Sequence, residues 1–344
     1  MDRFLAELVA DGGLACAAVA TVSGADGRAI LEASAGWRRA PDRPVAAGDR
    51  FDIASLTKPH VATLALRLAA RGALELSTPI GELFPRAAPA LARRTLEDLL
   101  RHRSGLRAWT PLFRRLRRGA GFGDRLAALL VGGELLGAAP GTYSDLGYVL
   151  WGLAAERALG RSLAALLAAE VIVPLGLAGT GPRPRGADVV ETRIDNQREV
   201  ELAAEQGIRV APRRERRVGR PYDANARFLG GLAAHAGLFA PAADLARLGR
   251  AWLSPRGYLP PAAVERALAG DGPYALGWAR QSDSGSSGPA LPPEAFGHTA
   301  FTGASLWIDP RRRRVLVLAA HRRSSTSDFN RARREFHRLV GELE

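Results

Sequence analysis

The sequence contains little cysteine and almost no lysine. Cys16 is the only cysteine in 344 residues, which excludes an intrachain disulfide and a cysteine-based metal cluster. Of the 48 lysine and arginine residues only Lys58 is lysine, so the other 47 are arginine. A bias toward arginine codons explains arginine on the surface, because either residue is well solvated there. A lysine that remains under this bias is a candidate for an amine that must lose a proton, which arginine does not do.

The chain also lacks the features of membrane and secreted proteins. No uninterrupted apolar run approaches the ~20 residues of a membrane span. Glu7 and Asp11 interrupt the apolar stretch that a secretory signal needs. We therefore expect a cytoplasmic protein without a membrane span, and we expect Cys16 to be a small buried residue.

The excess of arginine gives the chain a formal net charge of +13. The arginines are spread through the whole sequence, and none of their clusters is interleaved with stacking aromatics or placed in a nucleic-acid-binding motif. The six histidines are scattered and form no metal-ligand motif. The sequence therefore predicts no specific nucleic-acid partner, no metal site and no cofactor, and the positive charge indicates a solvated surface.

Strand patterns occur near both ends of the chain and helical patterns lie between them. The predicted strands are 15–22, 29–35, 275–280, 305–308 and 315–320. The predicted helices are 2–10, 55–70, 96–101, 125–136, 146–158, 163–172, 244–252, 262–269 and 328–343, and 179–225 reads as a loop. The predicted fold class is α+β, with an antiparallel sheet from both chain ends flanked by helices. We predict a single domain over 1–344, with an α/β lobe from about 1–60 and 270–344 and a mainly helical lobe from about 61–269.

Lys58 lies three residues after Ser55, at the start of the predicted helix. This spacing puts the two side chains on one face of the helix. A serine hydroxyl is a poor nucleophile until a base takes its proton, and a buried lysine acts as such a base because burial lowers its pKa. Ser-x-x-Lys alone is a weak signal, and the alternative interpretation is a helix cap followed by a surface lysine.

A second group lies in 140–148, where a glycine-rich turn precedes a predicted helix and presents Tyr143 and Asp145. A tyrosine beside a lysine relays protons if its pKa is lowered. The alternative interpretations are a core aromatic for Tyr143 and a helix N-cap for Asp145. Asp145 can also do both, capping the helix while its carboxylate faces the site.

A third group lies in 297–303, on a predicted edge strand. Small residues let a backbone approach a substrate closely. A backbone N–H in this segment would complete an oxyanion hole together with the N–H of Ser55. The alternative interpretation is a buried strand with a hydrogen-bonded histidine.

Together the three groups resemble the serine β-lactamase and penicillin-binding-protein superfamily, in which Ser-x-x-Lys, Tyr-x-Asn and Lys-Thr-Gly or His-Thr-Gly follow in this order. The chain is most similar to the class C β-lactamase-like branch, which includes family VIII esterases and D-amino-acid peptidases. The resemblance covers roughly residues 15–320. Further matching segments are 51–58, 95–106, 221–226, 230–239 and 307–310.

The resemblance implies a role for each matched residue. Ser55 would be the acylated nucleophile, Lys58 its activating amine, and Tyr143 the group that carries the proton to the leaving group. The backbone N–H groups of Ser55 and Phe301 would form the oxyanion hole. The other residues that it places at the substrate are Asp145, His298, Thr299 and Ala300.

Three departures from the family pattern bear on the substrate. Asp145 replaces asparagine, and a carboxylate beside Lys58 favours the ammonium form, which is the poorer base. His298 stands where many relatives have lysine, so a positive charge there requires a protonated imidazole at lower pH. Ala300 replaces glycine and adds a methyl group where a substrate amide would run. Each change argues against efficient β-lactam hydrolysis.

We therefore expect a serine hydrolase, most plausibly an esterase, that cleaves a small-molecule ester or amide through an acyl-enzyme on Ser55. The alternatives are β-lactamase or D-amino-acid peptidase activity at the same site, or a non-catalytic binding protein that retains the fold. The loops 105–124 and 179–225 are expected to shape the pockets. The physiological substrate and the oligomeric state stay open.

Overall fold

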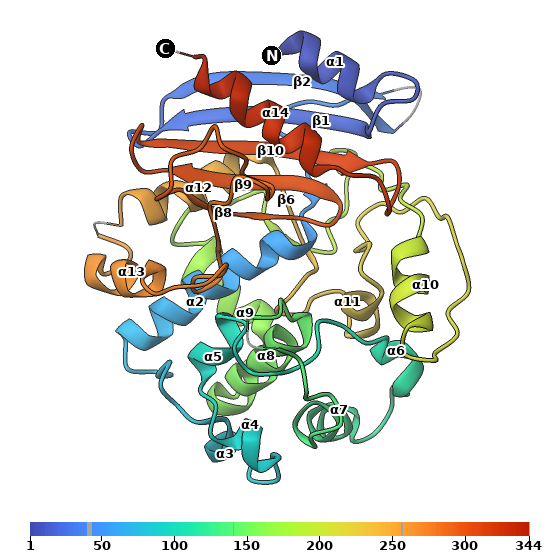
Figure 1. Ribbon diagram of the computed structural model, residues 1–344, viewed down its shortest axis with the longest axis vertical. Coiled ribbons are helices and arrows are strands. Elements are labelled where there is room, and N and C mark those ends of the chain that lie inside the picture. The colour runs from blue at the N-terminus through green and yellow to red at the C-terminus, as the bar shows by residue number, and fades with distance from the viewer. Residues whose placement is uncertain (40–42, 140, 256, 344) are drawn as a thin grey trace.

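The computed structural model describes residues 1–39, 43–139, 141–255 and 257–343. Across these residues both chain ends enter one antiparallel sheet in the order β3-β2-β1-β10-β9-β8-β7, as the sequence predicts (Figure 1). The strands are β1 (Ala15–Gly24), β2 (Ala29–Arg39), β3 (Arg43–Pro44), β7 (Ala279–Arg280), β8 (Phe296–Thr299), β9 (Gly303–Asp309) and β10 (Arg314–Arg322).

Helices cover both faces of this sheet. The helices α1 (Asp2–Val9) and α14 (Asn330–Gly341) pack on one face, and α12 (Ala242–Leu253) packs on the other (Figure 1). Alternate residues of β1 join the two apolar clusters, with Ala18 on the α1 side and Val19 on the α12 side. Burial on both faces explains why β1 is apolar along nearly its whole length.

The helix α2 (Thr57–Ala70) runs through the interior, and eleven of its fourteen residues are buried. It follows a short 3₁₀ turn, Ala54–Leu56. The strand β4 (Phe51–Asp52) precedes this turn in the chain. It belongs to a small second sheet together with β6 (Leu238–Ala240) and β5 (Gly181–Pro182), in the order β4-β6-β5. The remaining helices are α3 (Ile80–Leu83), α4 (Pro89–Ala92), α5 (Leu96–Leu100), α6 (Leu112–Arg115), α7 (Phe122–Val131), α8 (Asp145–Leu159), α9 (Leu163–Leu167), α10 (Gln197–Ala204), α11 (Ala224–Phe228) and α13 (Pro261–Leu268).

Four predictions of local structure need correction. The segment 179–225 is not all loop, because α10 forms inside it. The predicted strand 275–280 is a strand only at Ala279–Arg280, since Gly277 bends the chain with φ +80°. The strand β8 is not at the edge, because β7 pairs with its outer side. Cys16 is only partly buried. No helix in the described ranges combines the length and apolarity needed to cross a bilayer.

Candidate active site

The turn that carries Ser55 is strained and firmly held. Ala54, the residue before it, has φ +38°, a left-handed conformation that costs a non-glycine residue about 1–3 kcal/mol. The buried carboxylate of Asp52 offsets this cost, because its Oδ1 accepts from the N–H of Ala54 at 3.0 Å and its Oδ2 from the N–H of Tyr222 at 2.6 Å. This arrangement exposes Ser55 at the start of α2 and ties its turn to the 221–225 segment.

The amine of Lys58 is buried beside the serine. Its Nζ lies 3.0 Å from Ser55 Oγ and 2.7 Å from Asp145 Oδ1, and it also donates to the carbonyl of His235 at 3.2 Å. The side chain has no solvent exposure. Burial lowers the pKa of Lys58 below its ordinary value, and Asp145 opposes that shift. The two effects set how much of the amine is free to act as a base.

Tyr143 closes the other side of the amine, with its ring centre 4.7 Å from Lys58 Nζ. The ring also packs on His102, with centroids 4.5 Å apart. Burial, together with the charge of Asp145, raises the pKa of Tyr143 well above its usual value, against the contact with Ser55. This direction is opposite to the lowered pKa that a proton relay through phenolate requires, so Tyr143 keeps its proton in the resting site.

The N-cap residue of α8 is Ser144 and not Asp145. The Oγ of Ser144 accepts from the N–H of Gly147 at 3.1 Å, which is an N-cap hydrogen bond. Its own N–H donates to His102 Nδ1 at 3.0 Å. Because Ser144 caps the helix, the carboxylate of Asp145 is available to pair with Lys58.

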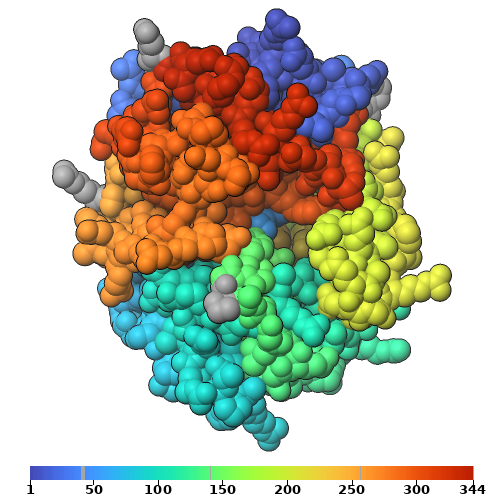
Figure 2. Space-filling model, in the orientation of Figure 1, coloured from blue at the N-terminus to red at the C-terminus, as the bar shows by residue number. Residues whose placement is uncertain are grey.

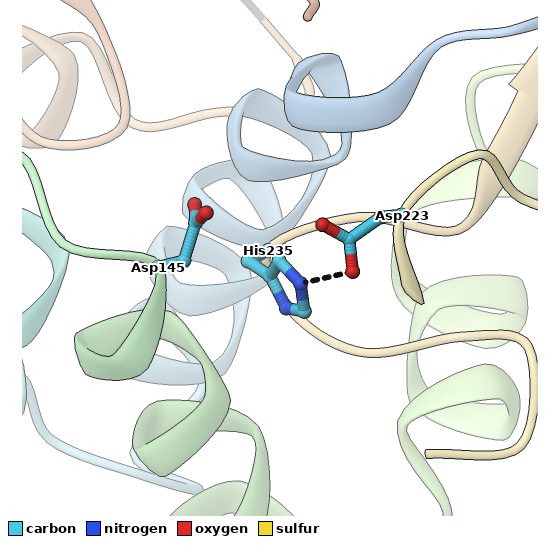
Figure 3. A group of neighbouring side chains, drawn as sticks. All are labelled: Asp145, Asp223 and His235. Atoms are coloured by element: carbon cyan, nitrogen blue, oxygen red, sulfur yellow. Dashed lines mark hydrogen bonds and ion pairs between the residues drawn. The ribbon is translucent and has the colours of Figure 1, made fainter. Parts of the chain in front are cut away.

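A second carboxylate approaches the same region from the 221–225 segment. His235 Nε2 lies 3.0 Å from Asp223 Oδ1, and one ligand atom each of Asp145, Asp223 and His235 lies within 4.8 Å of the others (Figure 3). Burial would raise the pKa of Asp223, but His235 and the N–H of Ala226 hold it at about 2. These groups have the chemistry to hold a cation, and the Lys58 ammonium already pairs with Asp145.

The end of β8 forms the opposite wall. His298 Nδ1 donates to the carbonyl of Thr299 at 2.9 Å, and burial together with Lys58 lowers the pKa of His298 to about 3. A positive charge on this imidazole therefore requires a pH well below neutrality, in the direction that the sequence predicts. Among the described residues, neither the N–H of Ser55 nor that of Phe301 donates to a protein acceptor.

All of these walls face one cleft of about 700 Å³. Figure 2 shows it as a hollow between the red and orange C-terminal part of the chain and the green and yellow segments, with blue residues at its base. Loop residues Ala108 and Trp109 line it, as do Arg198 and Glu199 of α10. The seven predicted site residues on the cleft surface are Ser55, Tyr143, Asp145, His298, Thr299, Ala300 and Phe301.

Sequence reasoning missed several residues of this site. Asp223 and His235 were noted only within segments that match relatives, and Asp52 only within the Ser-x-x-Lys segment. The signal that would have found Asp52 is its place two residues before Ala54, where a carboxylate commonly accepts a backbone N–H in a turn.

Comparisons with known proteins agree with this arrangement. A sequence model of the beta-lactamase family matches residues 1–339. An N-acetylmuramyl-L-alanine amidase of Bacillus subtilis is 28% identical over 330 residues, which are 83% of this chain and 72% of the amidase. Esterase EstB of Burkholderia gladioli is 34% identical over 160 residues, which are 42% of this chain and 41% of the esterase.

The fold also matches a solved structure along its whole length. A class C beta lactamase from Rhodobacter sphaeroides superimposes with a TM-score of 0.72 at 19% identity and covers 99% of both chains. An identity this low shows a shared fold and leaves the chemistry of the cleft to be argued from its own residues.

Proposed function

The chain belongs to the beta-lactamase family, and on this premise we propose that it is a serine hydrolase that cleaves a small ester or amide through an acyl-enzyme on Ser55. The observation that carries the proposal is the buried contact of 3.0 Å between Lys58 Nζ and Ser55 Oγ. A buried amine within hydrogen-bond reach of a hydroxyl is the arrangement that activates a serine nucleophile.

The first half of the reaction forms the acyl-enzyme. Neutral Lys58 takes the proton of Ser55 Oγ as the oxygen attacks the acyl carbon. The oxyanion that forms accepts from the N–H groups of Ser55 and Phe301, which have no other protein acceptor among the described residues. Tyr143, which holds its proton at rest, delivers it to the leaving oxygen or nitrogen, and the proton on Lys58 returns to the phenolate.

The second half releases the acyl group. A water molecule takes the place of the leaving group, and neutral Lys58 accepts its proton as the water attacks the acyl carbon. The bond to Ser55 Oγ breaks, and the oxygen recovers a proton from Lys58. The products are the free acid and the alcohol or amine, and the site returns to its starting charge.

Two features of the β8 wall favour an ester over a β-lactam. His298 is neutral, so it offers no fixed charge to a substrate carboxylate. Ala300 is buried at the strand end and places a methyl group beside the path of a substrate amide. The names of the relatives include both an esterase and an amidase, so amides remain the second substrate class to test.

The decisive experiment labels the protein with a fluorophosphonate probe and measures hydrolysis of p-nitrophenyl butyrate. We expect both signals in the wild type and in Ser77→Ala, an exposed serine away from the cleft, and neither in Ser55→Ala. Turnover of nitrocefin and of D-amino-acid amides under the same conditions separates the substrate classes. Equal labelling of Ser55→Ala and the wild type would disprove the nucleophile, and a wild type without any labelling or turnover would favour a non-catalytic binding protein.

A further inference from the structure

A second largely buried cation lies next to the end of β8, where it lines the cleft. Arg333 belongs to α14 and is only 5% exposed. Its Nη2 donates to the carbonyls of Ala300 at 2.7 Å, Gly303 at 3.1 Å and Ala304 at 3.3 Å, and its Nη1 to Asn330 Oδ1 at 2.7 Å. Among the described residues no carboxylate lies within ion-pair distance of it. Its hydrogen-bond acceptors are therefore all uncharged: three backbone carbonyls and the side-chain amide oxygen of Asn330.

This position is costly for a charge. A buried ion without a counter-ion loses its hydration and regains only part of that energy from neutral acceptors. Burial and the nearby Arg322 lower the pKa of Arg333 to about 9, so the guanidinium is still charged at neutral pH. An apolar side chain of similar length would fill the same space without this cost, so the charge needs an explanation in what it contacts.

The shortest of its contacts reaches one particular peptide unit. The carbonyl of Ala300 and the N–H of Phe301 are the two ends of the same peptide group. A cation at the carbonyl oxygen draws electron density toward that oxygen, which makes the N–H at the other end a stronger donor. This N–H is the one on the cleft side that lacks a protein acceptor and that the proposed mechanism assigns to the oxyanion.

The same turn is held rigid around this peptide. The N–H of Gly303 also donates to the Ala300 carbonyl at 3.1 Å. Gly303 has φ +127°, and a side chain there would lie 2.9 Å from the carbonyl of Ala320 on β10. On the other side, Arg322 donates to the carbonyl of Phe301 at 3.4 Å, which belongs to the next peptide. Among the side chains that the structure describes, only that of Arg333 hydrogen-bonds the peptide that bears the Phe301 N–H.

We propose that Arg333 is a positioning residue that orients the Ala300–Phe301 peptide and strengthens its N–H as an oxyanion donor. This inference rests on the proposed acyl-transfer function. Although the side chain of Arg333 also lines the cleft, the proposed role is exerted through one peptide bond. Loss of an entire oxyanion donor costs ~10²–10³ in kcat, so loss of its polarisation is expected to cost a part of that, about tenfold.

The test compares Arg333→Met, which removes the charge at similar length, with Arg333→Lys, which keeps it. In Arg333→Met we expect kcat for p-nitrophenyl butyrate to fall about tenfold with KM unchanged within about twofold, because the donor acts on the transition state. Affinity for phenylboronic acid, which forms a tetrahedral adduct on serine, should fall by a similar factor. Arg333→Lys should recover most of both. Arg333→Gln replaces the Met variant if that variant does not fold.

Two controls separate this role from stability. Arg338→Met removes an exposed arginine of the same helix, which pairs with Glu335 and Glu342, and should match the wild type. Phe336→Leu removes buried volume from α14 without contacting the turn, so it lowers thermal stability alone. If Phe336→Leu lost kcat and boronate affinity as Arg333→Met does, the role would be structural and the proposal would be overturned.

A spectroscopic readout keeps the inference separate from the proposed function. The backbone amide proton of Phe301 should shift upfield in Arg333→Met relative to the wild type and return in Arg333→Lys, with or without turnover. An unchanged amide shift together with unchanged kcat would refute the inference alone. Absence of fluorophosphonate labelling in the wild type would refute the proposed function instead.

Discussion

The cleft has a buried cation on each side, and the two have opposite surroundings. Lys58 lies beneath the serine and faces the carboxylate of Asp145. Arg333 lies next to the strand end, and its hydrogen-bond acceptors are neutral oxygens, three of them backbone carbonyls. Neither side chain has appreciable contact with solvent. Burial thus acts on both in the same direction, and their partners make the difference.

This contrast explains which basic residue stands on which side. An amine that must accept and return a proton needs a pKa that surroundings can move, and Lys58 has burial and Asp145 acting on it in opposite directions. A charge that must stay fixed is better carried by guanidinium, whose ordinary pKa is so high that Arg333 keeps its proton at neutral pH even when buried. In a chain with 47 arginines, the one lysine stands at the position where the proposed mechanism requires proton loss.

The strongest way to break this comparison is to give both positions the same group. In Lys58→Arg we expect acylation of Ser55 to fall about 10²- to 10⁴-fold, because the base is lost while the charge stays. The larger head group also strains a closely packed site, at a cost of about 1–3 kcal/mol in the free energy of unfolding. Fluorophosphonate labelling rates and urea unfolding measure the two effects separately.

The reciprocal swap is the control, because Arg333→Lys keeps a cation without asking it to lose a proton. It should retain most of the activity. If Lys58→Arg kept full activity, the single lysine would have no special chemistry, and the difference between the two cations would be one of packing alone.

A subtler change leaves both cations in place and removes the carboxylate that distinguishes them. Asp145→Asn takes away the charge that raises the pKa of Lys58, so this pKa moves further below its ordinary value. The neutral, active amine then persists to lower pH, and the acid limb of the pH–rate profile shifts in that direction. At pH 6 we expect kcat/KM about three- to tenfold above wild type. A limb that stays in place would show that Lys58 is not the group that titrates.

The same substitution changes stability with a defined sign. The unfolded lysine titrates at its ordinary 10.5 and the folded one at a lower pH. Between those two values the unfolded chain binds more protons, so the free energy of unfolding rises with pH. Asp145→Asn lowers the folded-state pKa of Lys58 further, so the pH range in which stability rises with pH extends to lower pH. The variant should therefore be less stable than the wild type by up to about 3–5 kcal/mol near neutrality, and this difference should shrink toward pH 9. Urea unfolding at pH 7 and pH 9 measures it.

The sequence was enough to predict the parts of the site that depend on local spacing. Ser55 and Lys58 are one helical turn apart, and that distance needs no tertiary structure. The antiparallel sheet from both chain ends was also predicted, since strand patterns at the two ends leave few other pairings. Residues matched by resemblance, such as Tyr143 and Phe301, line the cleft as expected, and their chemical roles stay predictions.

Other features depend on contacts that spacing does not encode. Arg333 is one of many arginines, and no sequence motif surrounds it. Only its burial and its bond to the Ala300 carbonyl distinguish it from the others. The direction of the pKa shift at Tyr143 depends on burial, which the sequence does not give. The helix α10 was missed because it is only eight residues long and lies in a stretch rich in proline and glycine. Tertiary packing on the cleft decides its conformation.

The smallest expected effect concerns the imidazole between the two cations. Burial, Lys58 and Arg333 all lower the pKa of His298, to about 3, while its bond to the Thr299 carbonyl opposes them. His298→Gln replaces one neutral donor with another, so kcat/KM should stay within about threefold, and the pH–rate profiles of the two proteins should have the same shape from pH 5 to 8. A limb near pH 6 that disappears in the glutamine variant would contradict this. It would mean that His298 gains a charge near neutral pH despite its burial beside Lys58 and Arg333.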